Sequence, residues 1–221
     1  MKNSLFQGIN YNAHLKRLLD VFLASFLLLL FFPVCLIVSL AIKLDSEGPI
    51  LADVPERVGQ NGALFKMYKF RSMIKNAHAL LHTDSRFKTL FLQYQKDSYK
   101  LKDDPRVTQV GKWIRKHSID EIPQLFNVLH GEMSMVGPRA YYPDELENQQ
   151  KKHPETKKFV SEVLSVKPGI TGLWQVSGRS EVHFDKRIAL DAEYIKSISL
   201  LEDVKIIGRT PFVMISGRGA V

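Results

Sequence analysis

A long apolar run from Leu18 to Leu44, interrupted only by Asp20, two serines and Lys43, constrains the fold most strongly. A helix needs about 20 predominantly apolar residues to cross the hydrocarbon core of a bilayer, so this run is long enough to do so. A secretory signal sequence is the first alternative, but the apolar stretch is too long and no small-residue cleavage site follows it. The run therefore predicts a permanent membrane segment.

Pro33 lies near the middle of this run. A proline inside a helix removes one hydrogen bond and bends the axis, and each arm of roughly 20 Å could enter one leaflet and return. Lys16 and Arg17 precede the run and Lys43 lies near its exit, which fits both ends on the same, positively charged side of a membrane. From these residues alone, a spanning helix and a re-entrant helix broken at Pro33 are equally compatible with the sequence.

Beyond this segment the sequence is that of a soluble, basic domain, so we expect a membrane-associated part over 1–45 and a catalytic or binding domain over 46–221. The formal net charge of +8 suits phosphorylated substrates, anionic lipid headgroups or nucleic acid. No helix-turn-helix, RNP or zinc pattern is present, which argues against nucleic acid. Cys35, the one cysteine, lies inside the apolar run, so a disulfide framework is excluded.

Two adjacent carboxylates, Asp120 and Glu121, precede a short apolar-periodic segment. The common interpretation is helix capping, because Ser118-x-x-Glu121 has the form of a capping box, and Asp120 as N-cap would put Pro123 in the first turn. Gly131 would then end the helix. The other interpretation is chemical: a carboxylate can act as a nucleophile or bind a metal ion.

Two loops downstream carry groups suited to phosphates. Residues 136–139 read Val-Gly-Pro-Arg, and a guanidinium is a strong partner for phosphate. Residues 167–179 hold three glycines, a proline, an indole and a terminal guanidinium. Backbone amides, a stacking surface and a cation together could hold a nucleoside diphosphate.

The remaining pattern is mainly helical, with a short strand-like stretch over 64–73. Residues 74–102 indicate one or two amphipathic helices, whose apolar stripe would lie in the core or in the headgroup layer of a membrane. Residues 185–214 are also expected to be helical. In that region Arg187 and Asp191 should form surface or inter-helix pairs, and the buried candidates include Leu190, Tyr194, Ile198, Leu201 and Val204.

Nearly end to end, the chain resembles the bacterial sugar transferases that start surface-glycan assembly, the monotopic polyprenyl-phosphate phosphoglycosyl transferases. Long motifs in one order carry the resemblance: Lys16-Arg17-x-x-Asp20, Gly48-Pro49, Arg57-x-Gly59, Lys69-Phe70-Arg71-Ser72-Met73, Asp104-Pro105-Arg106-Val107-Thr108, Arg115-x-x-Ser118-x-Asp120-Glu121-x-Pro123-Gln124-Leu125, Asn127-Val128, Gly131-Glu132-Met133-Ser134, Val136-Gly137-Pro138-Arg139, Lys167-Pro168-Gly169-Ile170-Thr171-Gly172-Leu173-Trp174-Gln175-Val176-x-Gly178-Arg179 and Asp191-x-x-Tyr194. This chain departs from the pattern at Ala52–Pro55, where the family usually has aromatics and a glutamine, and at Ala140, where it often has proline.

The resemblance implies an α+β, mainly helical fold. A re-entrant membrane helix-break-helix with its break at Pro33 would precede a small cytoplasmic catalytic domain that has amphipathic interface helices and a short β element. It makes Asp120 and Glu121 the catalytic dyad and the ligands of Mg²⁺, with Glu121 acting as metal ligand or as base. The implied substrate-binding residues are Lys69, Arg71, Arg115, Pro138, Arg139, Trp174, Gln175 and Arg179.

The activity that the resemblance implies is transfer of sugar 1-phosphate from a UDP-sugar to undecaprenyl phosphate, with release of UMP, through a covalent aspartyl-phosphosugar intermediate. This would be the first membrane step of exopolysaccharide, capsule, O-antigen or glycoprotein glycan synthesis, at the inner leaflet of the bacterial cytoplasmic membrane. A homodimer is compatible with it, and the sugar stays open. The alternative is a non-catalytic, membrane-tethered scaffold that binds anionic lipid or glycan-assembly partners.

Overall fold

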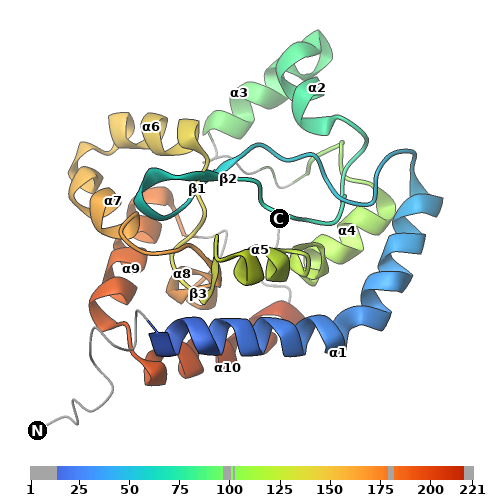
Figure 1. The fold of residues 1–221 in the computed structure, drawn as a ribbon. Helices are drawn as coiled ribbons and strands as arrows, with labels where there is room; N and C mark the ends of the chain where they lie inside the picture. Colours follow the sequence, from blue (N-terminus) through green and yellow to red (C-terminus); the bar gives the residue numbers. More distant parts are fainter. Residues whose placement is uncertain (1–13, 97–100, 102, 179–181, 217–221) are drawn as a thin grey trace, which may run out of the picture.

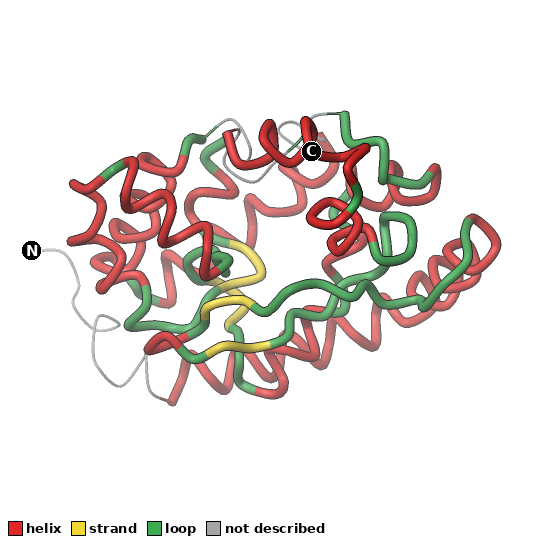
Figure 2. Tube along the Cα trace, turned by 90° about the horizontal axis from the view of Figure 1, so that it is seen from above, coloured by secondary structure: helices red, strands yellow, loops and turns green. Residues whose placement is uncertain are grey.

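The computed structural model describes residues 14–96, 101, 103–178 and 182–216. One long helix, α1 (Lys16–Asp45), forms the base of the molecule in Figure 1, and shorter helices and loops are stacked on it. Two pairs of very short strands lie among these helices, as Figure 2 shows from above. The mainly helical fold predicted from the sequence is therefore confirmed.

Helix α1 is long and apolar enough to cross a membrane, as predicted. It continues without interruption through Pro33 and bends in its second half (Figure 1). A proline that removes one hydrogen bond explains such a bend. The predicted helix-break-helix is thus one bent helix in this structure.

Both halves of α1 are packed against the rest of the protein. Ala24, in the first half, is fully buried in a cluster with Leu125 and Met135. Val38 and Ile42, in the second half, are buried in a separate cluster with Phe70 and Ile114. The opposite face of α1 is exposed and apolar along its whole length, with Leu18, Phe22, Phe26, Leu29, Leu30, Phe32, Leu36, Ile37, Leu40 and Leu44.

Polar contacts anchor the beginning of α1. The Arg17 guanidinium donates hydrogen bonds to the Val128 and Leu129 carbonyl oxygens, at 2.5 and 2.9 Å. The buried Asp20 carboxylate accepts hydrogen bonds from the Ser134 hydroxyl at 3.0 Å and the Met135 N–H at 2.9 Å. These contacts explain part of the Lys16-Arg17-x-x-Asp20 motif, because the spacing of three residues places Arg17 and Asp20 on one helix face.

The end of α1 is held by a single buried arginine. Arg71 donates to the carbonyl oxygens of Ile42, Ser46 and Pro49 and to the Ser46 hydroxyl, at 3.3, 2.7, 2.6 and 2.5 Å respectively. Carbonyl groups in the last turn of a helix have no partner within the helix, so a cation there satisfies them. Both ends of α1 are therefore fixed to the same domain.

The strands are shorter than predicted. In one sheet, β1 (Arg57–Val58) pairs antiparallel with β2 (Leu64–Phe65), and in the other β3 (Ser134–Val136) pairs parallel with β4 (Gly169–Thr171). The stretch predicted as strand-like over 64–73 is regular only at β2, and beyond it forms isolated bridges at Phe70 and Met73. Short pairings suffice there because side chains and helix ends provide the other hydrogen bonds.

The helices between and after the strands largely follow the predicted order. They are η3 (Gln60–Gly62), α2 (Ala77–Thr83), η4 (Ser85–Phe87), α3 (Lys88–Lys96), α4 (Gln109–Lys116), η5 (Ile119–Glu121), α5 (Gln124–His130), α6 (Pro143–Lys152), η6 (Pro154–Thr156), α7 (Lys157–Val163), α8 (Leu173–Val176), α9 (Phe184–Ser197) and α10 (Leu200–Ser216). Figure 1 shows α2 and α3 on the side of the domain opposite the first half of α1. Leu81 of α2 is buried, so this part of the amphipathic stripe of 74–102 lies in the core.

Burial in the last two helices differs from the sequence prediction in part. Tyr194 is buried as predicted, whereas Leu201 and Val204 are 63% and 56% exposed. Amphipathic reasoning assumes that the apolar face of a helix points inward, but α10 has apolar residues on its outer side as well. Arg187 is buried and pairs with Glu145 of α6, which confirms an inter-helix pair and excludes a surface position.

Candidate active site

The carboxylate pair lies in a short 3₁₀ turn, η5, that is separate from the helix after it. Ser118 has a left-handed backbone (φ 55°), and its side chain makes no capping hydrogen bond. Helix α5 begins only at Gln124, with Pro123 at its N-cap, and Gly131 ends it at φ 82° as predicted. The capping interpretation of Asp120 and Glu121 is therefore wrong.

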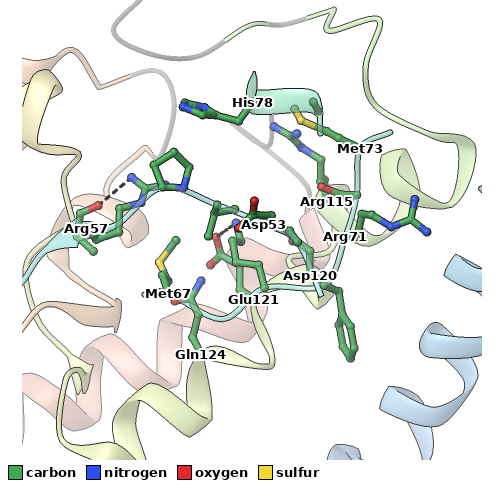
Figure 3. Close-up of a pocket in the computed structure, with 18 of the residues that line it drawn as sticks. Asp53, Arg57, Met67, Arg71, Met73, His78, Arg115, Asp120, Glu121 and Gln124 are labelled. Carbon is green, nitrogen blue, oxygen red and sulfur yellow. Dashed lines mark hydrogen bonds and ion pairs between the residues drawn. The ribbon is translucent and has the colours of Figure 1, made fainter. Parts of the chain in front are cut away.

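Lys69 joins the two carboxylates. Its Nζ atom lies 3.0 Å from Asp120 Oδ2 and 3.1 Å from Glu121 Oε1. The Asp120 side chain is only 7% exposed, that of Lys69 21% and that of Glu121 34%, so Glu121 is the more accessible carboxylate. Figure 3 shows Asp120 and Glu121 side by side in the middle of the site. Two carboxylates and one ammonium leave this group with a net negative charge.

The backbone on both sides of Lys69 is fixed to the elements that carry the carboxylates. The Phe70 N–H donates to the Asp120 carbonyl oxygen at 2.9 Å, and the Tyr68 N–H donates to Asn127 Oδ1 at 2.9 Å. Asn127 is fully buried, and its Nδ2 group donates to the Lys66 carbonyl oxygen at 2.8 Å and to Glu132 at 2.7 Å. Sequence reasoning named Asn127 only as part of a family motif, because nothing local shows that its amide holds a distant loop.

Burial and charge oppose one another at this group. Burial raises the pKa of Asp120 above its usual value, the Lys69 ammonium works against this, and the Glu121 charge adds to it. Burial alone would lower the pKa of Lys69, but the attraction of Asp120 and Glu121 raises it. Lys69 therefore stays protonated at neutral pH and favours the ionised form of the two carboxylates.

These groups line a cavity of about 320 Å³. Most of the residues predicted for the site meet there, although they come from distant parts of the chain: Lys69, Arg71, Arg115, Asp120, Glu121, Arg139, Trp174 and Gln175. Pro138 does not line the cavity, and its carbonyl oxygen accepts a hydrogen bond from the Gly169 N–H at 2.8 Å. Arg179 lies outside the described residues.

Arg139 belongs to a buried network behind the cavity. Its backbone N–H donates to Asp191 Oδ2 at 3.1 Å. Its guanidinium lies 5.4 Å from the centre of the Trp174 ring, and the guanidinium of Arg187 lies 5.2 Å from the same centre. The Glu145 carboxylate lies 4.0 Å from Arg139 Nε and 3.3 Å from Arg187. Burial raises the pKa of Asp191 to about 7. Arg139 is therefore held in a set position by charge and by stacking.

Two predicted substrate contacts have clear structural partners. The donor groups of Arg71 hold the end of α1, as described above, although its side chain borders the cavity. The Gln175 amide donates to the Ile170 carbonyl oxygen at 2.7 Å. Their roles in substrate binding stay predictions.

Arg57, which was not predicted as a site residue, also lines the cavity. Its guanidinium lies 3.3 Å from the centre of the Tyr142 ring, and it is almost completely buried. The Arg57-x-Gly59 motif was the only sequence signal for it, because a lone arginine at the start of a short strand is usually a surface residue.

The donor set at Asp120 and Glu121 suits Mg²⁺. This ion is commonly bound by one or two carboxylates, with water and substrate phosphates completing its shell. In the described part of the chain, no three His, Cys, Asp or Glu side chains lie close enough together to bind a metal ion. A three-ligand site for a softer metal is therefore not found among these residues. The two carboxylates are the residues that would hold the ion.

Comparison with known proteins identifies the family. The model of the bacterial sugar transferases matches residues 11–217. The undecaprenyl-phosphate galactose phosphotransferase of Salmonella typhimurium is 42% identical over 213 residues, which are 93% of this chain and 41% of that protein. The exopolysaccharide production protein ExoY of Rhizobium meliloti is 39% identical over 205 residues, covering 93% of this chain and 87% of that protein.

A third relative, the undecaprenyl-phosphate glucose phosphotransferase of Komagataeibacter xylinus, is 43% identical over 197 residues, or 87% of this chain and 34% of that protein. The chain thus spans less than half the length of several relatives it matches. It belongs to the bacterial sugar transferase family, which confirms the resemblance read from its motifs.

Replacing Lys69 tests the electrostatics of the site. In Lys69→Met, Asp120 and Glu121 lose their cation, so the pKa of Asp120 should rise further. A carboxyl group whose pKa is higher in the folded protein than in the unfolded one binds more protons when folded. The free energy of unfolding therefore falls as the pH rises from the unfolded-state pKa of 3.8 through the folded-state pKa. We expect a loss of about 2 kcal/mol at pH 8 that shrinks at pH 5, measured by denaturant unfolding in detergent.

Lys66→Met is the matched control, because Lys66 is exposed and its ion pair with Asp53 is weak at 3.5 Å. It should be nearly neutral at both pH values. A Lys69→Met loss that does not depend on pH would contradict the assigned role of Lys69.

Proposed function

We propose that this protein transfers sugar 1-phosphate from a UDP-sugar to a membrane polyprenyl phosphate and releases UMP. The observation that carries the proposal is the buried Asp120, paired with Lys69 at 3.0 Å in a cavity that arginines also line. The names of its relatives, which include undecaprenyl-phosphate galactose and glucose phosphotransferases, support the same reaction class.

Asp120 is the proposed nucleophile. One of its carboxylate oxygens attacks the β-phosphorus of the UDP-sugar. The bond from that phosphorus to the bridging oxygen breaks, and the oxygen leaves with UMP. A phosphate oxygen of the polyprenyl phosphate then attacks the same phosphorus, which frees the Asp120 carboxylate and gives a polyprenyl diphosphate sugar. The first step needs an ionised Asp120 and the second step releases it in that form, which the Lys69 ammonium favours.

The cations of the cavity have separate proposed tasks. A carboxylate attacks a diphosphate slowly unless the negative charge is neutralised, and Arg115 and Arg139 border the cavity where they could do this. Mg²⁺, when held by Asp120 and Glu121, supplies further positive charge next to the diphosphate. Glu121, the more exposed carboxylate, acts as a metal ligand and not as a base in this proposal.

The membrane proposal rests on the exposed apolar surface. It includes the outer face of α1 and, on α10, Leu201, Val204, Phe212 and Ile215. Ile206 of α10 is buried in the same cluster as Ala24 of α1, so the two helices pack against one core and expose apolar residues on their outer sides. A surface of this size on a soluble protein would be a strong aggregation site, so burial in lipid is the better explanation.

The polar contacts at the two ends of α1 favour a re-entrant helix. The contacts of Arg17 and Asp20 at its start and of Arg71 at its end tie both ends to one domain. If that domain lies on one side of the bilayer, α1 has to enter and leave on that side. We therefore propose that α1 lies in the inner leaflet of the bacterial cytoplasmic membrane, with the cavity facing the cytoplasm, where UDP-sugars are made.

The covalent scheme predicts that Asp120→Asn abolishes turnover, because it keeps the shape of the side chain but removes its charge. We expect UMP release from a panel of UDP-sugars to fall by at least about 1,000-fold. Wild-type protein incubated with labelled UDP-sugar, without lipid acceptor, should carry the label on Asp120, as peptide mass spectrometry can detect.

Asp144→Asn is the control for that experiment, because Asp144 is exposed at the start of α6. It should keep wild-type rates. Turnover by Asp120→Asn would rule out the covalent route, and a wild-type protein that releases no UMP from any UDP-sugar would favour the scaffold.

The metal proposal predicts that EDTA stops UMP release and that added Mg²⁺ restores it. Glu121→Gln should raise the Mg²⁺ concentration needed for half-maximal activity, because it removes one charged ligand. Full activity of the wild type in EDTA would remove the metal from the proposal and leave charge neutralisation to the arginines.

The topology proposal predicts the same accessibility for both ends of α1. We would place a single cysteine at His14 or at Glu47, in a Cys35→Ser background, and treat intact cells with a membrane-impermeant thiol reagent. Both positions should be protected until the inner membrane is permeabilised. Labelling of the His14 position from outside would instead establish that α1 spans the membrane.

A further inference from the structure

Arg57 is a buried cation at the edge of the candidate active site. It begins β1, and the residue is 6% exposed. One guanidinium nitrogen donates to the Ala140 carbonyl oxygen at 3.2 Å, and the group stacks on Tyr142. Figure 3 shows Arg57 and Arg71 on opposite sides of the Asp120–Glu121 pair. Arg57 and Arg71 thus line opposite walls of the cavity.

The charge of Arg57 is poorly compensated. Among the described residues it makes no ion pair, and its Nε atom is buried without a hydrogen-bond acceptor. Other buried arginines differ: Arg106 pairs with Asp104 at 2.6 Å, and Arg71 donates to four oxygen atoms. A buried guanidinium without a carboxylate destabilises a protein unless another anion pairs with it. The fold therefore maintains a buried cation that no ion pair among the described residues neutralises.

The surroundings of Arg57 indicate what kind of anion is missing. Burial lowers the pKa of Arg57, and the positive charge of Arg139 lowers it further, so the two guanidinium groups repel one another. Glu145 and the ring of Tyr142 offset this only in part. Two cations close enough to repel suit a ligand with two negative groups, and guanidinium matches phosphate oxygens in geometry.

We propose that Arg57 binds the diphosphate of the nucleotide sugar, together with Arg139. This inference rests on the proposed function and adds to it a substrate contact on the β1 side of the cavity. Arg57 is then a binding residue, and Asp120 and Lys69 remain the groups next to the reacting phosphorus. The phosphate of the lipid acceptor has the same chemistry, so an experiment has to distinguish the two sources.

The test measures binding of UDP to the purified full-length protein in detergent, by calorimetry and by the rise in melting temperature. Arg57→Met should weaken UDP binding at least about tenfold, the usual range for a lost charge-assisted contact. Without ligand, its melting temperature should equal or exceed that of the wild type, because the substitution removes an uncompensated buried charge. Arg57→Lys keeps the charge without the fork geometry and should bind UDP with intermediate affinity.

Arg106→Met is the matched control, a buried arginine that has a carboxylate partner. It should lower the melting temperature, since Asp104 is left unpaired, and keep its affinity for UDP. The opposite responses of the two variants separate a binding arginine from a structural one. If Arg57→Met does not fold, Arg57→Lys carries the test, and wild-type UDP affinity in that variant would count against the proposal.

Three outcomes would overturn the inference. The first is an Arg57→Met variant that binds UDP as tightly as the wild type does. The second is a ligand-free stability that falls while UDP affinity is kept, and the third is a loss confined to the Michaelis constant for polyprenyl phosphate. The last pattern would assign Arg57 to the lipid acceptor. Because the readout is UDP binding, it is independent of turnover: wild-type protein that binds UDP through Arg57 but releases no UMP would disprove the proposed function alone.

Discussion

The contact of Lys69 with Asp120 and Glu121 is the interaction on which the site depends. Without a cation, two adjacent carboxylates in a largely buried position would repel one another and favour protonation. Lys69 counters this from a different segment of the chain, and that segment is fixed by Asn127 and by the Asp120 carbonyl oxygen. The same hydrogen bonds that complete the fold therefore set the ionisation of the proposed nucleophile.

Around this contact, the cavity combines two sets of cations with different support. Arg139 is backed by Glu145, Asp191 and Trp174, so its position is set by a buried network. Arg57 makes no ion pair among the described residues, so in our proposal it is the group whose charge a ligand compensates most effectively. The structure thus distinguishes arginines that are backed by carboxylates from Arg57, which makes no ion pair among the described residues; composition and net charge cannot do this.

Much of the organisation could be predicted from the sequence. The length and apolarity of 18–44, the helices after residue 184 and the motif residues around Asp120 were identified because each rests on a local pattern. The capping interpretation of Ser118 and Glu121 failed, because the left-handed backbone at Ser118 depends on packing that a local pattern does not contain. Arg57 and Asn127 were missed as site residues for a similar reason: their importance comes from partners that are distant in sequence, Tyr142 for one and Lys66 and Tyr68 for the other.

The sequence analysis divided the chain into a membrane-associated part over 1–45 and a domain over 46–221, yet the inner face of α1 completes two hydrophobic clusters of that domain. A protein cut before Asp45 would lose Ala24 from one cluster and Val38 and Ile42 from the other, leaving Leu125, Met135, Phe70 and Ile114 open to water. It would also leave the Arg71 guanidinium without the carbonyl oxygen of Ile42. Deleting this long apolar helix would therefore not yield a water-soluble enzyme, because α1 is also part of the hydrophobic core.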